Sequence, residues 1–229
     1  MPSGRSPDQL VRDGLSDHKA GKIARAAKKY RAALKQFTNH PDANHLLGVL
    51  KLQSEGPEAS LPYLERAVDA NPEAATYWFN LANARFRTAD FVSAIKAFET
   101  ARRLAPNTPE IELNYSSALQ QADRPFDALA VLRDVYRAGR ANSGIMHNYL
   151  SLLDRTNELD EAREVLANVP DRWTQRLDCG VLSAHLHRRL GQTDIGWGTL
   201  QKLKPADAPA PLAKEYHYEV ARYHEAAGR

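Results

Sequence analysis

Several features that mark particular protein classes are absent from this chain of 229 residues. It has one cysteine, Cys179, so no disulfide can form within the chain, which fits a reducing compartment. We expect Cys179 to be buried as a small hydrophobe. No apolar run reaches the ~18 residues that span a bilayer, and Met1 to Ser6 contain no apolar signal region. These absences predict a cytoplasmic protein without membrane insertion.

Catalytic and metal-binding motifs are missing as well. The stretch from Ala20 to Ile23 suggests a phosphate-binding loop, but Ser16 replaces its first glycine and Ile23 its hydroxyl residue. The histidine pairs lack the i, i+4 spacing with an acid that holds zinc on a helix, and no nucleophile has an orienting partner. We therefore predict no metal, no cofactor and no enzymatic activity for the residues present.

The charge is nearly balanced, with a net value of +3 and a sequence pI near 8.9, which is too mild to indicate nucleic-acid binding. Basic residues are nevertheless crowded near the start: Lys19, Lys22, Arg25, Lys28, Lys29, Arg31 and Lys35. On a helix this spacing spreads them over an exposed surface. The cluster is either a solvated face or a surface for an acidic partner, whose binding would weaken steeply with salt.

What the chain does have is a repeat. Six positions, each 34 residues after the last, carry a residue no larger than serine: Ala26, Ser60, Ala94, Ala128, Ala162 and Gly196. Small residues are needed where two packed helices approach most closely, because a larger side chain there typically costs roughly 1–3 kcal/mol. The column therefore predicts an array of helical hairpins.

Other positions in the same register agree. Four residues after each small residue comes a large apolar one: Tyr30, Leu64, Phe98, Leu132, Leu166 and Leu200. Three further on stand Ala33, Ala67, Ala101, Val135, Val169 and Leu203. These offsets lie on one face of a helix, the second of each hairpin. An earlier column, mostly small, marks the first helix: Gly14, Gly48, Ala82, Ser116, Leu150 and Ala184.

The third unit carries a recognisable consensus: Trp78, Leu81, Ala82, Ala94, Phe98, Ala101 and Pro106. It resembles the tetratricopeptide repeat, which implies an all-α fold, a right-handed superhelix or solenoid of antiparallel helix hairpins. In the other units the Trp78 position holds Leu10, Asn44, Glu112, Met146 and Gly180.

The register predicts the domain organisation along the chain. We expect a flexible leader over 1–6 and six units over 7–204, starting near 7, 41, 75, 109, 143 and 177. A break rich in proline and alanine follows over 205–211. The segment 212–229 is then the first helix of a seventh unit or a cap.

In such a solenoid the first helices line the concave face. Asn80, Asn114 and Asn148 form a column there at the 34-residue step. This column resembles the asparagine ladder of a glycosyltransferase's repeats, in which carboxamides hold a peptide backbone; alternatively, the amides bond a neighbouring helix or water. The expected peptide-binding residues on the concave face are Phe79, Asn80, Asn83, Arg87, Asn114, Ser117, Gln121, His147, Asn148 and Arg155.

We therefore expect a protein interaction scaffold that binds an extended peptide or partner segment on this face. The sequence identifies neither the partner nor the oligomeric state. A second interpretation rests on His40 to Gly56 and on Tyr216 to Gly228, which resemble repeats of bacterial transferases of the sulfotransferase and O-linked N-acetylglucosamine transferase groups. That resemblance implies a substrate-recruiting N-terminal repeat region of a larger transferase whose catalytic domain is absent from this chain. Self-association through a terminal helix is a third possibility.

Overall fold

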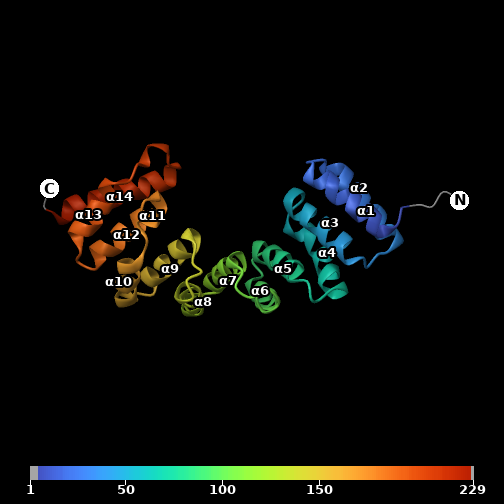
Figure 1. Cartoon of the computed structure of the whole chain (residues 1–229), viewed down its shortest axis with the longest axis horizontal. Helices are drawn as coiled ribbons and strands as arrows, with labels where there is room; N and C mark the ends of the chain where they lie inside the picture. Colours follow the sequence, from blue (N-terminus) through green and yellow to red (C-terminus); the bar gives the residue numbers. More distant parts are fainter. Residues whose placement is uncertain (1–4, 228–229) are drawn as a thin grey trace. The chain divides into compact units, whose positions relative to one another are not determined.

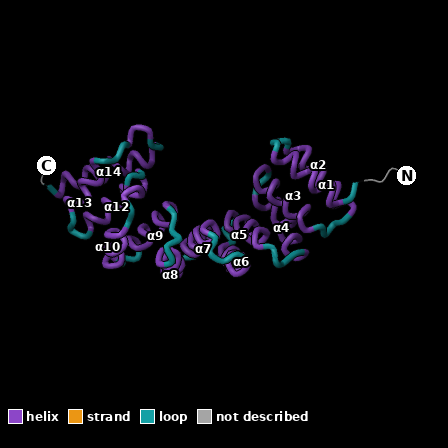
Figure 2. Tube along the Cα trace, in the orientation of Figure 1, coloured by secondary structure: helices purple, strands orange, loops and turns teal. Residues whose placement is uncertain are grey.

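A computed structural model describes residues 5–227, with the side chain of Asp207 left out. Over that range the chain forms fourteen α-helices and one short 3-10 turn, without a strand (Figures 1 and 2). The predicted all-α fold of helix hairpins is confirmed. Residues 1–4 of the predicted leader and residues 228–229 lie outside the described part of the chain. Two compact units are present, one ending at Asp123 and the other beginning at Arg124.

The first unit contains three hairpins and one further helix. Its helices are α1 (Pro7–Lys19), α2 (Ile23–Gln36), α3 (Pro41–Ser54), α4 (Pro57–Ala70), α5 (Ala75–Arg87), α6 (Phe91–Leu104) and α7 (Pro109–Gln121). The hairpin partners α1/α2, α3/α4 and α5/α6 pack closely, and each second helix also contacts the first helix of the next hairpin. This alternation buries a series of hydrophobic clusters between successive helices.

The second unit begins with a second helix. Its elements are α8 (Pro125–Arg137), α9 (Ser143–Arg155), α10 (Leu159–Asn168), α11 (Asp171–Thr174), α12 (Leu177–Arg189), α13 (Thr193–Gln201), the 3-10 turn η1 (Pro205–Asp207) and α14 (Ala210–Ala226). The predicted break over 205–211 therefore holds η1, and α14 begins at Ala210. The helix α14 packs on both α12 and α13.

Local sequence signals explain where helices start. Proline opens helices such as α1, α3 and α7, where its missing N–H is not needed. Elsewhere a side chain caps the free N–H groups: the Ile145 N–H donates to Asn142 Oδ1 (3.0 Å) and the Ser93 N–H to Asp90 Oδ1 (3.2 Å).

Turns inside the hairpins use left-handed backbone at the same 34-residue spacing. Gly21, Ala89, Asp123, Asn157 and Gly191 have φ between 58° and 72°, and Gly56 has φ 104°. This conformation lets the next N–H donate to a carbonyl five residues back, as from Asp90 to Arg85 (3.0 Å). Only glycine adopts it without steric cost, so Ala89 is strained.

The small-residue column has the predicted role. All six of its members are buried, Ala26 and Ala94 among them at 0% exposure. A Cβ built on Gly196 would lie 1.7 Å from Tyr223 Oη and 3.0 Å from the Ala184 carbonyl oxygen. In the first-helix column, a Cβ on Gly48 would meet the Leu64 side chain at 2.8 Å. The absence of side-chain volume therefore sets how closely the helices approach.

Two of the departures from Trp78 lie against the same part of the chain as Trp78 itself. Trp78 Nε1 donates to the carbonyl oxygen of Pro72 (2.7 Å), six residues earlier. In the preceding unit Asn44 Nδ2 makes the same contact with the Thr38 carbonyl (2.8 Å). In the last hairpin the carbonyl oxygen of Thr174 comes within 2.3 Å of a Cβ built on Gly180. At these three positions the column therefore binds or accommodates the chain that enters the first helix, whereas Glu112 of the same column pairs with Arg102 (2.7 Å).

One detail of the predicted register is wrong in the second unit. Val169 and Leu203 were expected within second helices, but α10 ends at Asn168 and α13 at Gln201. Val169 precedes Pro170, and a residue before proline disfavours the α conformation. The chain forms the unpredicted helix α11 before α12 instead. Leu166 is only half-buried, whereas its equivalents Leu132 and Leu200 are fully buried.

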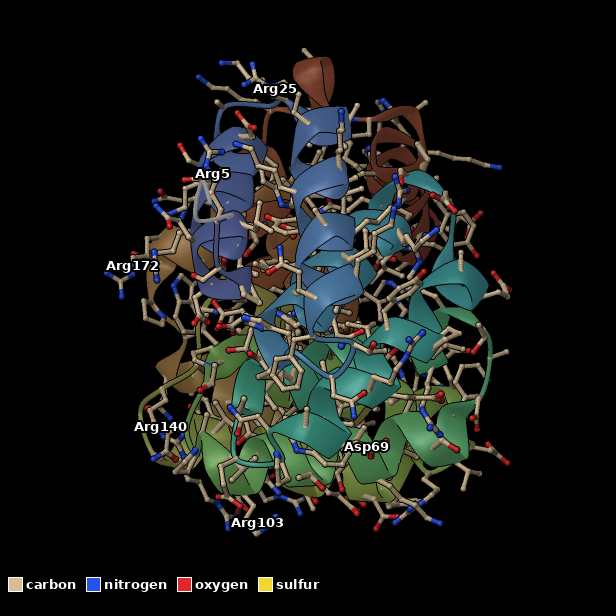
Figure 3. All side chains as sticks on the ribbon, turned by 90° about the vertical axis from the view of Figure 1, so that its right-hand side faces the viewer. Arg5, Arg25, Asp69, Arg103, Arg140 and Arg172 are labelled. Carbon is tan, nitrogen blue, oxygen red and sulfur yellow. The ribbon has the colours of Figure 1, made fainter. Side chains whose placement is uncertain are left out.

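The basic residues near the start lie mainly on the outside of α2. Lys22, Lys28, Arg31 and Lys35 are exposed, while Ala26 and Tyr30 of the same helix are fully buried. Figure 3 shows Arg25 of α2 and Arg103 of α6 projecting away from the ribbon. This is the solvated face that the sequence allowed, and its use by an acidic partner stays a prediction.

Two further expectations concern burial and length. Cys179 is buried, with 2% of its surface exposed, as predicted. Among the helices of residues 5–227, none combines the length and the apolar character that crossing a membrane requires.

Candidate partner-binding site

The asparagine column lies on first helices, and two of its amides already have protein partners. In the first unit Asn80 Nδ2 lies 2.8 Å from His45 Nε2, and Asn114 Nδ2 donates to Asn83 Oδ1 (3.1 Å). Asn148 is half-buried on α9 in the second unit. A carboxamide carries two N–H donors and one carbonyl acceptor. Asn80 and Asn114 therefore each retain hydrogen-bonding capacity beyond the bond to the neighbouring helix.

Other predicted residues of the first unit are engaged within the protein. Phe79 packs edge-on against Phe98 of its own hairpin, with ring centroids 6.1 Å apart. Arg87 donates to the Leu52 carbonyl oxygen (3.1 Å) at the C-terminal end of α3, where a cation complements the helix dipole. Ser117 Oγ donates to the Leu113 carbonyl (3.0 Å). Gln121 is exposed at the end of α7.

The second unit holds a groove that is lined by the first helices α9 and α12 together with α14. Its volume is about 340 Å³, and its apolar floor includes Val181 and Leu182. The predicted residue His147 lines it, whereas Arg155 and Asn148 do not. Ser151, Asp154 and Glu215 complete the polar rim.

Paired charges stiffen one side of the groove. Glu219 is 3% exposed, and its carboxylate accepts from Arg188 Nε (2.7 Å) and lies 3.2 Å from His185 Nδ1. Burial would raise the pKa of Glu219, but the hydrogen bonds from His185 and Arg188 outweigh it, so the pKa is lowered. The other ring nitrogen of His185 lies 3.5 Å from Asp154 Oδ2. His185 thus bridges carboxylates from two neighbouring helices.

A bidentate ion pair stabilises the helices behind this face. Arg133 of α8 donates to both carboxylate oxygens of Glu161 (2.7 and 2.6 Å), and Tyr149 of α9 donates to the same carboxylate (2.7 Å). Hydrogen bonds from Arg133 hold the pKa of Glu161 below its usual value. The pair joins α8, α9 and α10, and so fixes the helix that carries His147 and Ser151.

Most groove residues were not predicted from the sequence, because the sequence analysis compared only residues that are 34 positions apart. Contacts between successive first helices join residues 31 or 35 apart instead, as in Asn83 with Asn114 or Asn80 with His45. A separation of 31 residues is three fewer than the 34-residue repeat, and a separation of 35 is one more. The difference arises because neighbouring first helices are offset along their axes. The same 31-residue separation relates Asp154 to His185 in the groove. Pairs of polar residues 31 positions apart would have indicated the groove from the sequence.

Comparison with known proteins agrees with the fold. Residues 45–109 match the family model described as Tetratricopeptide repeat. No curated protein is significantly similar to the chain in sequence. Helical hairpins at this spacing define a helical-repeat fold. The match over residues 45–109 identifies tetratricopeptide repeats in that part of the chain, as the sequence predicts. Such repeats serve in general as scaffolds for protein interaction.

Solved structures share the architecture at low sequence identity. PilF of Pseudomonas aeruginosa is similar with a TM-score of 0.72 and 18% identity, over 93% of this chain and 97% of its own. A tetratricopeptide repeat protein from Parabacteroides merdae has a TM-score of 0.72 and 13% identity, over 98% of this chain and 88% of its own. YrrB, described as having an unusual peptide-binding site, has a TM-score of 0.65 and 17% identity, over 84% and 99%. At these identities the likeness shows the fold.

Proposed function

We propose that this chain is a protein interaction scaffold that binds an extended segment of a partner on the inner face made by its first helices. The main site is the groove of α9, α12 and α14. The observation that carries the proposal is that this groove of about 340 Å³ is lined by residues of three helices, α9, α12 and α14. One extended segment that crosses the groove would contact all three helices.

The chemistry of the groove suits a peptide. Val181 and Leu182 offer an apolar floor, while Ser151 and Glu215 offer hydrogen-bonding groups at the rim. Tyr218 is 59% exposed beside them and adds aromatic surface, which is common at protein interfaces. The similarity in fold to YrrB supports the proposal, since that protein is described as having a peptide-binding site.

The test is selection of peptides from a random library against the full chain, followed by affinity measurement with a blocked groove. Ser151→Trp fills the groove, and we expect it to weaken binding of the selected peptides by at least about tenfold. Ala130→Trp, on the exposed side of α8, is the matched control and should leave affinity within about twofold. Equal affinity for both variants would exclude the groove as the site.

The asparagine column is proposed as a second contact surface, in the first unit. A peptide that binds there should be insensitive to Ser151→Trp. The double variant Asn80→Ala with Asn114→Ala should weaken it roughly thirtyfold, because each lost amide hydrogen bond is worth about 1 kcal/mol. Asn168→Ala, exposed on α10, serves as the control. If the double variant changes only the melting temperature, the amides serve packing between helices alone.

Activity, compartment and parent protein remain predictions. The residues present are proposed to be non-catalytic, and a cytoplasmic location is proposed from composition. The transferase alternative also stays a prediction, since no observation in the fold favours it over the scaffold.

A further inference from the structure

Three side chains with metal-binding atoms meet in the wall of the groove. His147 of α9 and Asp178 and Cys179 of α12 each place one donor atom within 4.8 Å of the others. His147 and Asp178 line the groove, and Cys179 is buried behind it. The sequence does not show this cluster as a motif, because His147 and Asp178 are 31 residues apart, the spacing at which successive first helices meet.

The imidazole of His147 has one ring nitrogen without a hydrogen-bond partner in the part of the chain that the structure describes. Nδ1 of His147 is buried, and no hydrogen-bond partner for it exists among the described residues. A buried polar nitrogen without a partner is costly and calls for a missing ligand or water. The Cys179 thiol makes a long contact, 3.7 Å, with the Ser143 carbonyl oxygen and also interacts with the Asp178 carboxylate.

The set of donors indicates which ion would fit. One imidazole nitrogen, one carboxylate oxygen and one sulfur are the ligands of zinc, which takes them at about 2.0–2.3 Å in tetrahedral geometry. Tetrahedral ligands lie about 3.3–3.8 Å apart at those bond lengths. The three donors lie within 4.8 Å of one another, so a zinc ion would have to draw them closer together. Because His147 and Asp178 line the groove, an ion that they hold would border it.

Two local features oppose the ion and therefore set its affinity. Arg176 donates to both oxygens of Asp178 (3.2 and 2.9 Å), which lowers the pKa of that carboxylate. Burial raises the pKa of the Cys179 thiol to about 11. A bound zinc ion deprotonates a coordinating thiol outright, and a carboxylate oxygen paired with arginine keeps another lone pair free. The guanidinium is thus a competitor for Asp178.

We propose that His147, Asp178 and Cys179 form a binding site for a zinc-type divalent ion with one open position toward the groove. The direct probe is cobalt(II), added without oxygen to the full chain after any purification tag is removed. We expect one equivalent to bind with a thiolate-to-cobalt charge-transfer absorption, and zinc to displace it. Binding without that absorption, or no binding, would overturn the proposal.

Variants separate this site from a lone thiol and from surface histidines. Cys179→Ala should abolish the absorption, and His147→Gln and Asp178→Asn should each weaken zinc at least tenfold in calorimetry. His217→Gln, exposed on α14, is the control and should change nothing.

Arg176→Gln provides a variant with the opposite expected sign. It removes the competing cation from an exposed position, so zinc should bind several-fold more tightly while the fold, checked by circular dichroism, is retained. An absorption that survives both His147→Gln and Asp178→Asn would show a solitary cysteine and contradict the site. Weaker zinc binding in Arg176→Gln would also contradict it.

Discussion

Both units are built from packed helix hairpins, but the lengths of their second helices are more regular in the first unit than in the second. In the first, α2, α4 and α6 each have 14 residues and follow one pattern. In the second, the second helices α10 and α13 have 10 and 9 residues, and the short helix α11 is inserted. The groove and the His147, Asp178 and Cys179 cluster both occur in the less regular unit, although they lie on α9, α12 and α14 and not on the shortened helices.

The first unit contains a buried neutral pair in addition to its ion pairs. His45 is 9% exposed, stacks on Tyr77 at 4.4 Å and contacts Asn80. Both units also contain carboxylates held by arginine, at Glu112 in the first and at Glu219 and Glu161 in the second. Neutral and charged networks respond to acid at different pH, so this difference can be measured.

The largest expected effect tests whether close helix packing in the second unit also requires a small residue at the column position Gly196. Gly196→Ala should destabilise the protein by about 2–4 kcal/mol, because the new methyl group collides with Tyr223 and breaks its bond to the Ala184 carbonyl. Gly198→Ala in the same helix meets nothing within 4 Å and should be neutral or stabilising. Urea unfolding measures both, and equal effects would show that α14 is not packed there.

Acid should distinguish the units next. Burial lowers the pKa of His45 to about 4, from 6.5, so the unfolded chain binds the proton more readily. Stability from this group is therefore full above pH 6.5 and falls as the pH drops toward 4, by up to about 3 kcal/mol. Glu161 and Glu219 have lowered pKa values, so their contribution is lost only below about pH 4.5.

Tryptophan fluorescence can follow the two units separately. Trp78 reports on the first, and Trp173 and Trp197 on the second. Trp78 should respond first as the pH falls, and His45→Gln should remove that early change. His217→Gln should leave it. A simultaneous response in the unsubstituted protein, unaffected by His45→Gln, would contradict the assignment.

The smallest expected effect concerns the turns of the regular unit. Ala89→Gly should stabilise the protein by about 1 kcal/mol, because Ala89 has φ 60°. Ala130→Gly, in the middle of α8, should destabilise it by a similar amount. Thermal melting compares the two. A loss of stability in Ala89→Gly would mean that its left-handed turn is not strained.

Structural features that depend on residues close together in the sequence can be predicted from it, whereas features that depend on contacts between distant residues are harder to predict. The positions of helices and of the buried small column follow from residues such as Ala94 and Gly196, because close helix packing excludes larger side chains. The early end of α10 also has a local cause, because Val169 is followed by Pro170. Its consequence, the helix α11, depends on packing against Gly180 and was not predicted.

The candidate site was harder to predict from the sequence than the fold. Of the predicted peptide-binding residues, His147 lines the groove, while Asp154, His185 and Glu219 were missed. Their proximity depends on the axial offset between neighbouring first helices, which the 34-residue period does not specify. Asn80 was identified as notable from its poor helix propensity. Its partner His45 follows only from the structure.

The central claim is that partners bind on the faces of first helices, and methyl NMR tests it most directly. On adding a selected peptide, the methyl signals of Val181 and Leu182 in the groove should shift. Those of Val92 and Ile195, exposed on the second helices α6 and α13, should not. Shifts confined to Val92 or Ile195 would place the partner on the opposite helices and contradict the account.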